Sequence, residues 1–336
     1  MENSISYILI SSVVKRTLND IKNNLERSIR NLIDMALQFS KGRFQQKFFS
    51  TVQTMLCNKN SAYYDLARDI VSYVDISRLY TFSMNLGYNS FTQGINLIRK
   101  NEKKLGCNIP WALAIQIDLQ QFNKKRYHKV IDMGEELGIY TCMLFCKGHT
   151  NRALNLAKEH KNSAFFIFCD TNDITPAFIE EAAEINNIMP VVRFDENTAH
   201  IYTPMRNTGI PFSVWYSYGQ KDIETIINGD LFYSAQQLSP VFTALLPEPN
   251  CTDSMQRLAH QTVIKERNEQ NYRTILFEMQ GDMELIDEII SADSCPAYFD
   301  SNGFINDWSG PINCEHNNLF EGKLSDIFIS AYPKKI

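Results

Sequence analysis

Short apolar runs alternate with amphipathic segments through the middle of this 336-residue chain, and the alternation constrains its fold more than any other feature. The runs are rich in β-branched and aromatic residues, as strands are. They lie at 112–118, 140–145, 164–169, 189–194, 211–217 and 231–234, with helix-like segments at 123–137, 151–160 and 175–185 between the first four. Successive runs begin about 20 to 28 residues apart, which is the length of one βα unit. We therefore expect a parallel sheet or a partial barrel of six units.

The region before this alternation predicts helices. Six apolar residues at heptad-like spacing predict one long amphipathic helix that ends at Gly42: Val14, Leu18, Ile21, Leu25, Leu32 and Met35. Such spacing over about three heptads also suits pairing with another chain, but packing against the chain's own helices is the favoured outcome. Further helices are expected at 44–56, 63–74 and 91–104.

The last part of the chain is expected to mix helix and strand. A helix is predicted at 254–268 and a strand at 274–277, and the turn signal Asp300-Ser-Asn-Gly303 separates short strand-like pieces. These patterns divide the chain into an N-terminal helical domain (1–106), a barrel (107–250) and a C-terminal extension (251–336).

Charge and cysteine usage limit the classes of partner and compartment. A net charge of −5 argues against general nucleic-acid affinity, yet residues 1–110 carry 15 Lys and Arg against 8 Asp and Glu, which suits docking of an acidic partner as well as ordinary surface variation. The eight cysteines are scattered, as in proteins with reduced thiols. The run Tyr7–Val14 lacks the flanks of a signal peptide, and no stretch approaches the roughly 18 apolar residues of a membrane span. We expect a soluble cytoplasmic protein that binds neither nucleic acid nor membrane.

An ordered set of short segments runs from residue 84 toward the C-terminus. The set comprises Met84-Asn-Leu-Gly-Tyr-Asn-Ser-Phe91, Asn101-Glu-Lys-Lys104, Ile109-Pro-Trp111, Glu135-Glu-Leu-Gly-Ile-Tyr140, Gly209-Ile-Pro-Phe212 and Leu245-Leu-Pro-Glu-Pro249. In this order and spacing it resembles the radical SAM superfamily, and within it the SPASM-like subgroup that carries auxiliary clusters. The resemblance implies an α/β fold: a partial (β/α)6 TIM-like barrel of radical SAM type, with an N-terminal helical domain and a C-terminal α+β extension.

The positions that carry this family's chemistry differ here. The family places a CxxxCxxC loop after its first strand to ligate an iron-sulfur cluster, whereas this sequence has no cysteine from 108 to 141, and Asp118 is followed within a few residues by the helix expected at 123–137. The family's Gly-Gly-Glu-Pro, which holds the methionyl amine of S-adenosylmethionine, falls on Cys146-Lys-Gly-His149. Lys147 would then face a like charge.

Other family positions are retained only in part. The family's Thr-Asn-Gly element is echoed by Thr171-Asn-Asp173, and the segment Arg193-Phe-Asp195 keeps one acid, so Asp195 is the remaining candidate for cofactor binding. Cys295 and Cys314 resemble remnants of an auxiliary-cluster region, but two thiols are too few to ligate a four-iron cluster alone.

A second interpretation places zinc or iron at the barrel rim. Cys142, Cys146 and His149 repeat the CxxxCxxC spacing with His last, and Cys169 ends the next strand-like run. The carboxyl ends of neighbouring strands meet at one edge, so Cys146, His149 and Cys169 could converge there, whereas Cys142 would lie about 13 Å deeper along the strand. Buried free cysteines are among the commonest core residues, and core thiols are the favoured interpretation of these residues.

The sequence therefore favours a catalytically degenerate radical SAM-like protein with no catalytic residues and no expected cofactor. It would act as a binding or partner subunit that recruits a peptide substrate or pairs with an intact radical SAM enzyme. The alternatives are a metal-dependent enzyme with the Cys/His site and a rewired S-adenosylmethionine-binding enzyme. His128 and His160 are expected on solvated helix faces, and Trp215, Tyr216 and Tyr218 either line a pocket or pack in the core.

Overall fold

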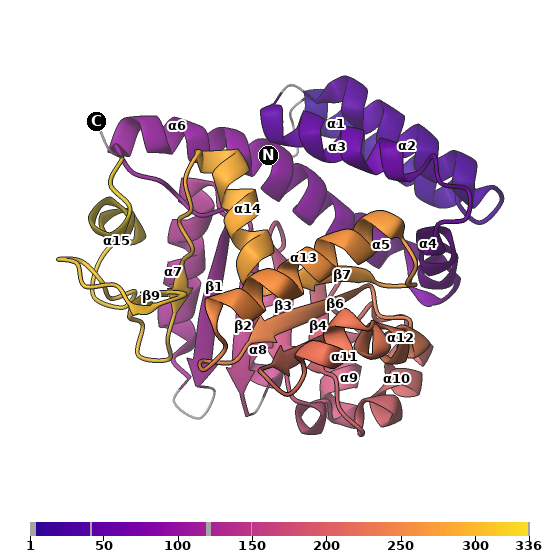
Figure 1. Cartoon of the computed structure of the whole chain (residues 1–336). Coiled ribbons are helices and arrows are strands. Elements are labelled where there is room, and N and C mark those ends of the chain that lie inside the picture. Colours follow the sequence, from indigo (N-terminus) through magenta and orange to yellow (C-terminus); the bar gives the residue numbers. More distant parts are fainter. Residues whose placement is uncertain (1–4, 41, 119–121, 149, 335–336) are drawn as a thin grey trace. The chain divides into compact units, whose positions relative to one another are not determined.

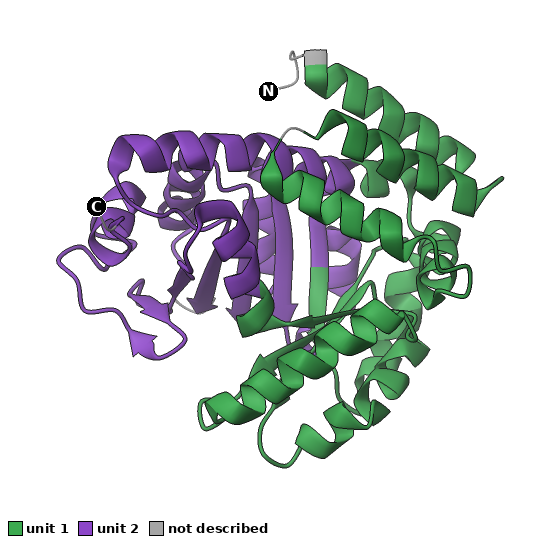
Figure 2. Cartoon of the chain, turned by 45° about the horizontal axis from the view of Figure 1, so that its top comes forward, with its two compact units in different colours: residues 1–80, 190–282 green, residues 81–189, 283–336 purple. Residues whose placement is uncertain are grey.

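The computed structural model describes residues 5–40, 42–118, 122–148 and 150–334. Within them the fold is mixed α/β, with ten strands (Figure 1). The chain divides into two compact units, each built from segments distant in sequence (Figure 2): unit 1 comprises residues 1–80 and 190–282, and unit 2 comprises residues 81–189 and 283–336. Strand β4 (Ile188–Arg193) contains one boundary between the units. The predicted domain limits at residues 106 and 250 stay a prediction.

The sheet of unit 2 centres on three parallel strands, as the alternation predicted. β1 (Ala112–Asp118) pairs with β2 (Thr141–Lys147), and β2 pairs with β3 (Ala164–Cys169). On the other side β1 pairs in parallel with β8 (Tyr298–Phe299), followed by antiparallel β9 (Ile305–Asp307) and β10 (Gly310–Pro311). Helices α7 (Lys124–Leu137), α8 (Asn151–Glu159) and α9 (Pro176–Ala182) follow β1, β2 and β3, with a 3-10 turn at Thr171–Asp173 before α9. The C-terminal helix is α15 (Leu324–Ala331).

The two faces of this sheet differ in exposure. Leu113, Ile115 and Ile117 of β1 are at most 1% exposed, whereas Ala114, Gln116 and Asp118 are half-buried. A Cβ built on Gly134 of α7 would lie 2.9 Å from Leu113 Cδ1, which shows that the Leu113 side packs against the helices. We call this side the helix face and the opposite side, with Gln116, the inner face.

Segments before β1 cover the amino ends of these strands. The expected helix at 91–104 is α6 (Ile95–Leu105), and it is preceded by a π-helix, η1 (Met84–Gly94), which the sequence did not predict. The amide of Asn85 donates to Lys161 O (2.8 Å) and Ser163 O (3.0 Å), so η1 holds the segment before β3.

In unit 1, β5 (Ser213–Tyr218) lies parallel between β4 and β6 (Phe242–Pro247), and β6 pairs with β7 (Ile275–Glu278). Helices α10 (Thr198–Asn207), α11 (Ile223–Ile227), α12 (Asp230–Ala235) and α13 (Asp253–Glu269) belong to the same unit, with a 3-10 turn at Gln236–Leu238 after α12. α14 (Met279–Ser291) follows β7. The core of unit 1 comprises Tyr218, Ile226, Leu231, Phe232, Leu245, Ala259, Val263 and Leu276.

The strand expected at 231–234 is wrong, because this segment lies in α12. Its buried residues Leu231, Phe232 and Ala235 are spaced as on a helix, and Tyr233 between them is 64% exposed. The sixth strand is instead β6, at 242–247.

The single long helix expected before Gly42 is also wrong. Unit 1 begins with α1 (Ile5–Asp20) and α2 (Leu25–Phe39), and Asn24 caps α2 by accepting a hydrogen bond from Arg27 N at 3.2 Å. An asparagine cap satisfies a backbone donor only at a helix start, so it favours the break. Helices α3 (Arg43–Met55), α4 (Ala62–Tyr73) and α5 (Ile76–Ser83) follow. Ile21 and Leu25 pack against Tyr64 of α4, as expected for packing within the chain.

Candidate functional site

The inner face of unit 2 carries an aromatic floor, in which Phe145 and Tyr298 are half-buried and Phe168 is buried. Phe145 of β2 stacks on Phe168 of β3 with ring centroids 4.4 Å apart, and Tyr298 of β8 meets Phe145 edge-on at 6.0 Å. The Tyr298 hydroxyl donates to Gln116 Oε1 at 3.1 Å, which fixes the ring next to β1. Burial raises the pKa of Tyr298, so this hydroxyl stays protonated. Flat rings beside an amide are a surface that suits peptide side chains and backbone.

Opposite charges border this floor at the carboxyl ends of the strands. Asp118 of β1 and Lys147 of β2 are register partners, so their side chains leave the sheet on the same face. Asp118 is half-buried and Lys147 is exposed. The predicted cation at Lys147 therefore stands on the inner face, beside the acid that ends β1.

Aromatic packing occupies the region where α7 begins. Phe122 stacks on Tyr127 at 5.3 Å, Tyr127 meets Phe320 edge-on at 5.5 Å, and the Arg126 guanidinium lies 5.5 Å from the centre of the Phe320 ring. Asn123 Oδ1 caps α7 by accepting from Arg126 N at 3.3 Å. A pocket of about 210 Å³ remains, lined by Asp118, Asn123, Arg126, Tyr127, Ser301, Asn302 and Phe320.

The predicted thiol ligands lie on the helix face. Leu113 pairs in register with Cys142 and Ile117 with Cys146, so both thiols point toward the helix layer, and both are buried together with Cys169. Burial raises the pKa of all three thiols, and the nearby Cys146 and Asp173 raise that of Cys169 further. A metal would have to displace protons from these thiols, since the thiolate is the ligand.

The metal site itself stays a prediction. His149 lies outside the described residues, so its position relative to Cys146 and Cys169 is not described. In the part of the chain that the structure covers, no group of three or more His, Cys, Asp and Glu side chains is arranged to hold a metal ion.

The predicted cofactor residue Asp195 takes part in a local turn of unit 1. Its Oδ1 accepts hydrogen bonds from Asn197 N at 2.8 Å and Thr198 Oγ1 at 3.4 Å at the start of α10. Of the aromatic residues of β5, Trp215 lies half-buried under the Arg193 guanidinium, with 5.5 Å between that group and the ring centre. Tyr218 is fully buried in the core of unit 1, and Tyr216 packs against this core. Of the two interpretations of these tyrosines, pocket lining and core packing, the structure shows core packing.

The two cysteines of the C-terminal extension are differently placed. Cys295 is fully buried, its backbone N–H donating to Asp287 Oδ2 at 3.3 Å, and its pKa is raised by burial. Cys314 is half-buried and its thiol donates to His316 O at 3.2 Å.

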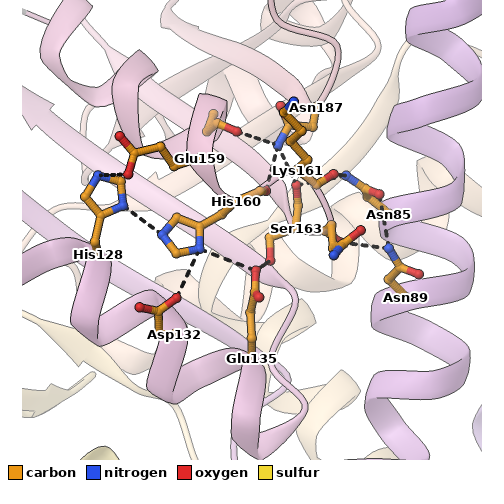
Figure 3. Close-up of polar contacts among 12 residues, drawn as sticks. Asn85, Asn89, His128, Asp132, Glu135, Glu159, His160, Lys161, Ser163 and Asn187 are labelled. Carbon is orange, nitrogen blue, oxygen red and sulfur yellow. Dashed lines mark hydrogen bonds and ion pairs between the residues drawn. The ribbon is translucent and has the colours of Figure 1, made fainter. Parts of the chain in front are cut away.

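The expectation that His128 and His160 are solvated is wrong. Their side chains are 14% and 7% exposed, and the rings lie against each other among acidic residues (Figure 3). His128, Asp132 and Glu135 are spaced four and three residues apart, which places them on one face of α7. This spacing was the sequence signal for the cluster, and its partners on α8 come only from the fold.

Comparison with known proteins shows the fold alone. No family model matches the chain, and no curated protein matches it. Three crystal structures of Streptococcus suis SuiB are similar to it, each 13% identical in sequence. SuiB bound to S-adenosylmethionine has a TM-score of 0.53 over 72% of this chain and 69% of SuiB. SuiB bound to the precursor peptide SuiA has 0.51 over 70% and 68%, and the third structure has 0.52 over 96% and 82%. The expected fold class, a partial barrel of radical SAM type, is confirmed.

Among the described helices, none has the length and apolar character needed to cross a membrane. The cytoplasmic location stays a prediction.

Proposed function

We propose that this chain is a radical SAM-like protein that binds a peptide on the inner face of unit 2 and performs no iron-sulfur chemistry. In this role it recruits a peptide substrate or serves as the partner subunit of an intact radical SAM enzyme. The basic N-terminal region is the candidate surface for contact with such an enzyme.

One observation carries the proposal: the two faces of β1 to β3 have separate uses. The inner face presents the half-buried rings of Phe145 and Tyr298, bordered by Asp118 and Lys147, and a peptide can contact these groups. The thiols of β2 and β3 lie on the helix face with raised pKa values. The cysteines nearest to the strand ends are therefore turned away from the surface that a ligand would reach.

The start of α7 supports the same proposal. The radical SAM resemblance expects three thiolates between β1 and α7, and residues 108–141 contain no cysteine. Phe122, Tyr127 and Phe320 pack together beside the helix start, where the resemblance expects the cluster loop. SuiB, whose fold this chain shares, has been crystallised with the precursor peptide SuiA, which supports a peptide as the class of ligand.

Selection from a phage-displayed library of random peptides tests the inner face. We expect enriched peptides to bind the purified chain, and Phe145→Leu to weaken that binding about fivefold, because it removes one aromatic ring worth about 1 kcal/mol. Cys142→Ser on the helix face of the same strand is the matched control and should leave affinity unchanged. The proposal is wrong if the selected peptides bind both variants equally well.

The metal alternative rests on one observation, the proximity of two thiols. The Cys146 thiol raises the pKa of Cys169, and both follow the register pair Phe145–Phe168. Stoichiometric zinc in the purified chain that is lost in Cys146→Ala would favour this alternative.

A further inference from the structure

Two imidazoles face each other between α7 and α8 in unit 2 (Figure 3). His128 Nδ1 lies 2.8 Å from His160 Nε2, and the ring centroids are 5.0 Å apart with 26° between the ring planes. His128 belongs to α7, and His160 is the residue that ends α8. Two titratable rings thus share one hydrogen bond in a largely buried position.

The outer nitrogen of each ring faces carboxylates. His160 Nδ1 lies 3.6 Å from Glu135 and 3.7 Å from Asp132, and His128 Nε2 lies 3.2 Å from Glu159. Lys124 Nζ is 2.5 Å from Glu159. A pocket of about 250 Å³ opens beside the pair. It is lined by the two histidines, the three carboxylates, Lys161 and Asn162. The charged side chains that face the pair are Lys124, Asp132, Glu135, Glu159 and Lys161.

This arrangement favours one number of protons on the two imidazole rings. Each outer nitrogen lies 3.2 to 3.7 Å from a carboxylate oxygen, and beside that negative charge an N–H is favoured over a lone pair. The 2.8 Å contact between the rings has room for one more proton. Three protons therefore suit all three positions, and the pair then carries one positive charge. With two protons, either one outer nitrogen turns a lone pair toward a carboxylate, or the two inner nitrogens face each other with lone pairs. With four, two N–H groups meet at the 2.8 Å contact between the rings.

We propose that His128 and His160 form a proton-operated latch between α7 and α8, which is closed when the pair holds three protons and opens when it gains a fourth. The charge of the closed state resides on His160, because the C-terminal end of α8 favours a cation and two carboxylates lie beside the ring. His128 is then neutral and carries its proton on Nε2, toward Glu159. Burial lowers the pKa of His128, as a neutral ring at this position requires, although Glu159 opposes the shift.

Hydrogen bonds connect the latch to the sheet. The amide of Asn187 donates to His160 O at 3.0 Å and to Ser163 O at 3.0 Å, and the hydroxyl of Ser163 donates to Glu135 at 2.6 Å. Ser163 directly precedes β3. Opening of the ring pair therefore frees Glu135 and Ser163 to move, and it loosens α7 and α8 on the helix face.

The latch is tested on the full chain by two measurements over pH 5 to 8. Nitrogen NMR of labelled imidazoles reports the proton on each ring atom, and hydrogen exchange reports the protection of α7 and α8. As pH falls, we expect two transitions separated by more than about one pH unit. In the first, at the higher pH, His160 becomes doubly protonated. In the second, α7 and α8 lose protection from hydrogen exchange. His128→Gln and His160→Gln should each leave a single transition.

The matched control is His200→Gln, which removes an exposed imidazole from α10 in unit 1. It should leave both transitions unchanged. The proposal is overturned if the two rings of the unmodified chain titrate independently, or if protection of α7 and α8 follows that of α13 at every pH. Both outcomes are read from the unmodified chain, so they do not depend on whether the variants fold.

Discussion

Asp287 shows how a single buried group makes stability depend on pH. Its side chain is 1% exposed near the end of α14, where Oδ2 accepts from Cys295 N at 3.3 Å. Burial raises the pKa of Asp287 to about 8, although the hydrogen bonds to its carboxylate oppose the shift. A carboxyl group in such a site is protonated at neutral pH and carries no charge.

Asp287→Asn is expected to reduce the pH dependence of the free energy of unfolding. The folded chain keeps a proton on Asp287 that the unfolded chain releases above its ordinary pKa of 3.8. Stability from this proton is complete below pH 3.8 and falls as pH rises toward 8, by at most about 1.4 kcal/mol per pH unit. Urea unfolding at pH 5 and pH 8 measures the free energy of unfolding of the variant and of the unmodified chain. Relative to the unmodified chain, the variant should be more stable at pH 8 than at pH 5.

The exposed neighbour Glu288 on the same helix supplies the control for this prediction. Glu288→Gln should change stability equally at both pH values. An Asp287→Asn variant whose difference from the unmodified chain is the same at pH 5 and pH 8 would show that Asp287 is charged in the folded chain.

At the scale of elements, the π-helix η1 depends on a close approach to α7. A Cβ built on Gly94 would lie 2.5 Å from the backbone oxygen of Gly138 and 2.7 Å from that of Asn89. Gly138 is the residue that caps the C-terminal end of α7. Both are backbone atoms, which cannot move aside as a flexible side chain can. Gly94 is thus required by the contact between two elements.

We expect Gly94→Ala to destabilise the chain by about 1 to 3 kcal/mol, the usual cost of overpacking. Gly87 lies in the same π-helix with no atom within 4 Å of a built Cβ, and it is the matched control. Gly87→Ala should be neutral or slightly stabilising, since alanine favours helix by up to about 1 kcal/mol over glycine. Thermal unfolding of both variants measures the contrast, and equal melting temperatures would contradict the account of this contact.

The start of α9 is encoded locally in the sequence. Thr175 caps α9, its Oγ1 accepting from Phe178 N at 3.1 Å, and Pro176 takes the first helical position, at the start of the segment expected to be helical at 175–185. The break at Asn24 was missed because the heptad spacing continues across it, while the cap acts only locally. The segment 231–234 was misassigned because four apolar or small residues fit a strand and a helix turn equally well.

Thr175→Ala should reduce the free energy of unfolding by about 1 kcal/mol, because it removes the oxygen that caps α9. Thr175→Ser keeps that oxygen and should remain close to the unmodified chain. Chemical denaturation measures both variants. If Ser and Ala cost the same, the hydroxyl does not cap the helix.

For the whole molecule, the sequence predicted the fold more fully than the candidate site. The alternation of apolar runs located β1 to β5, and the ordered segments implied the barrel type that the likeness to SuiB confirms. The face of β2 that carries the thiols could not be predicted, because apolar side chains lie on both of its faces. Only the pairing of Cys142 with Leu113 and of Cys146 with Ile117 shows that the thiols lie on the helix face. The His128–His160 pair joins helices that meet only in the folded chain.

We propose that this fold binds its ligand without an iron-sulfur cluster. Anaerobic reconstitution with iron and sulfide, followed by measurement of iron per chain, tests it most directly, with a Cys146→Ala, Cys169→Ala variant as the control for iron bound by core thiols. We expect no stoichiometric iron on the unmodified chain or on the variant. About four irons per chain with a broad absorbance near about 400 nm, lost in the variant or retained by it, would contradict the account.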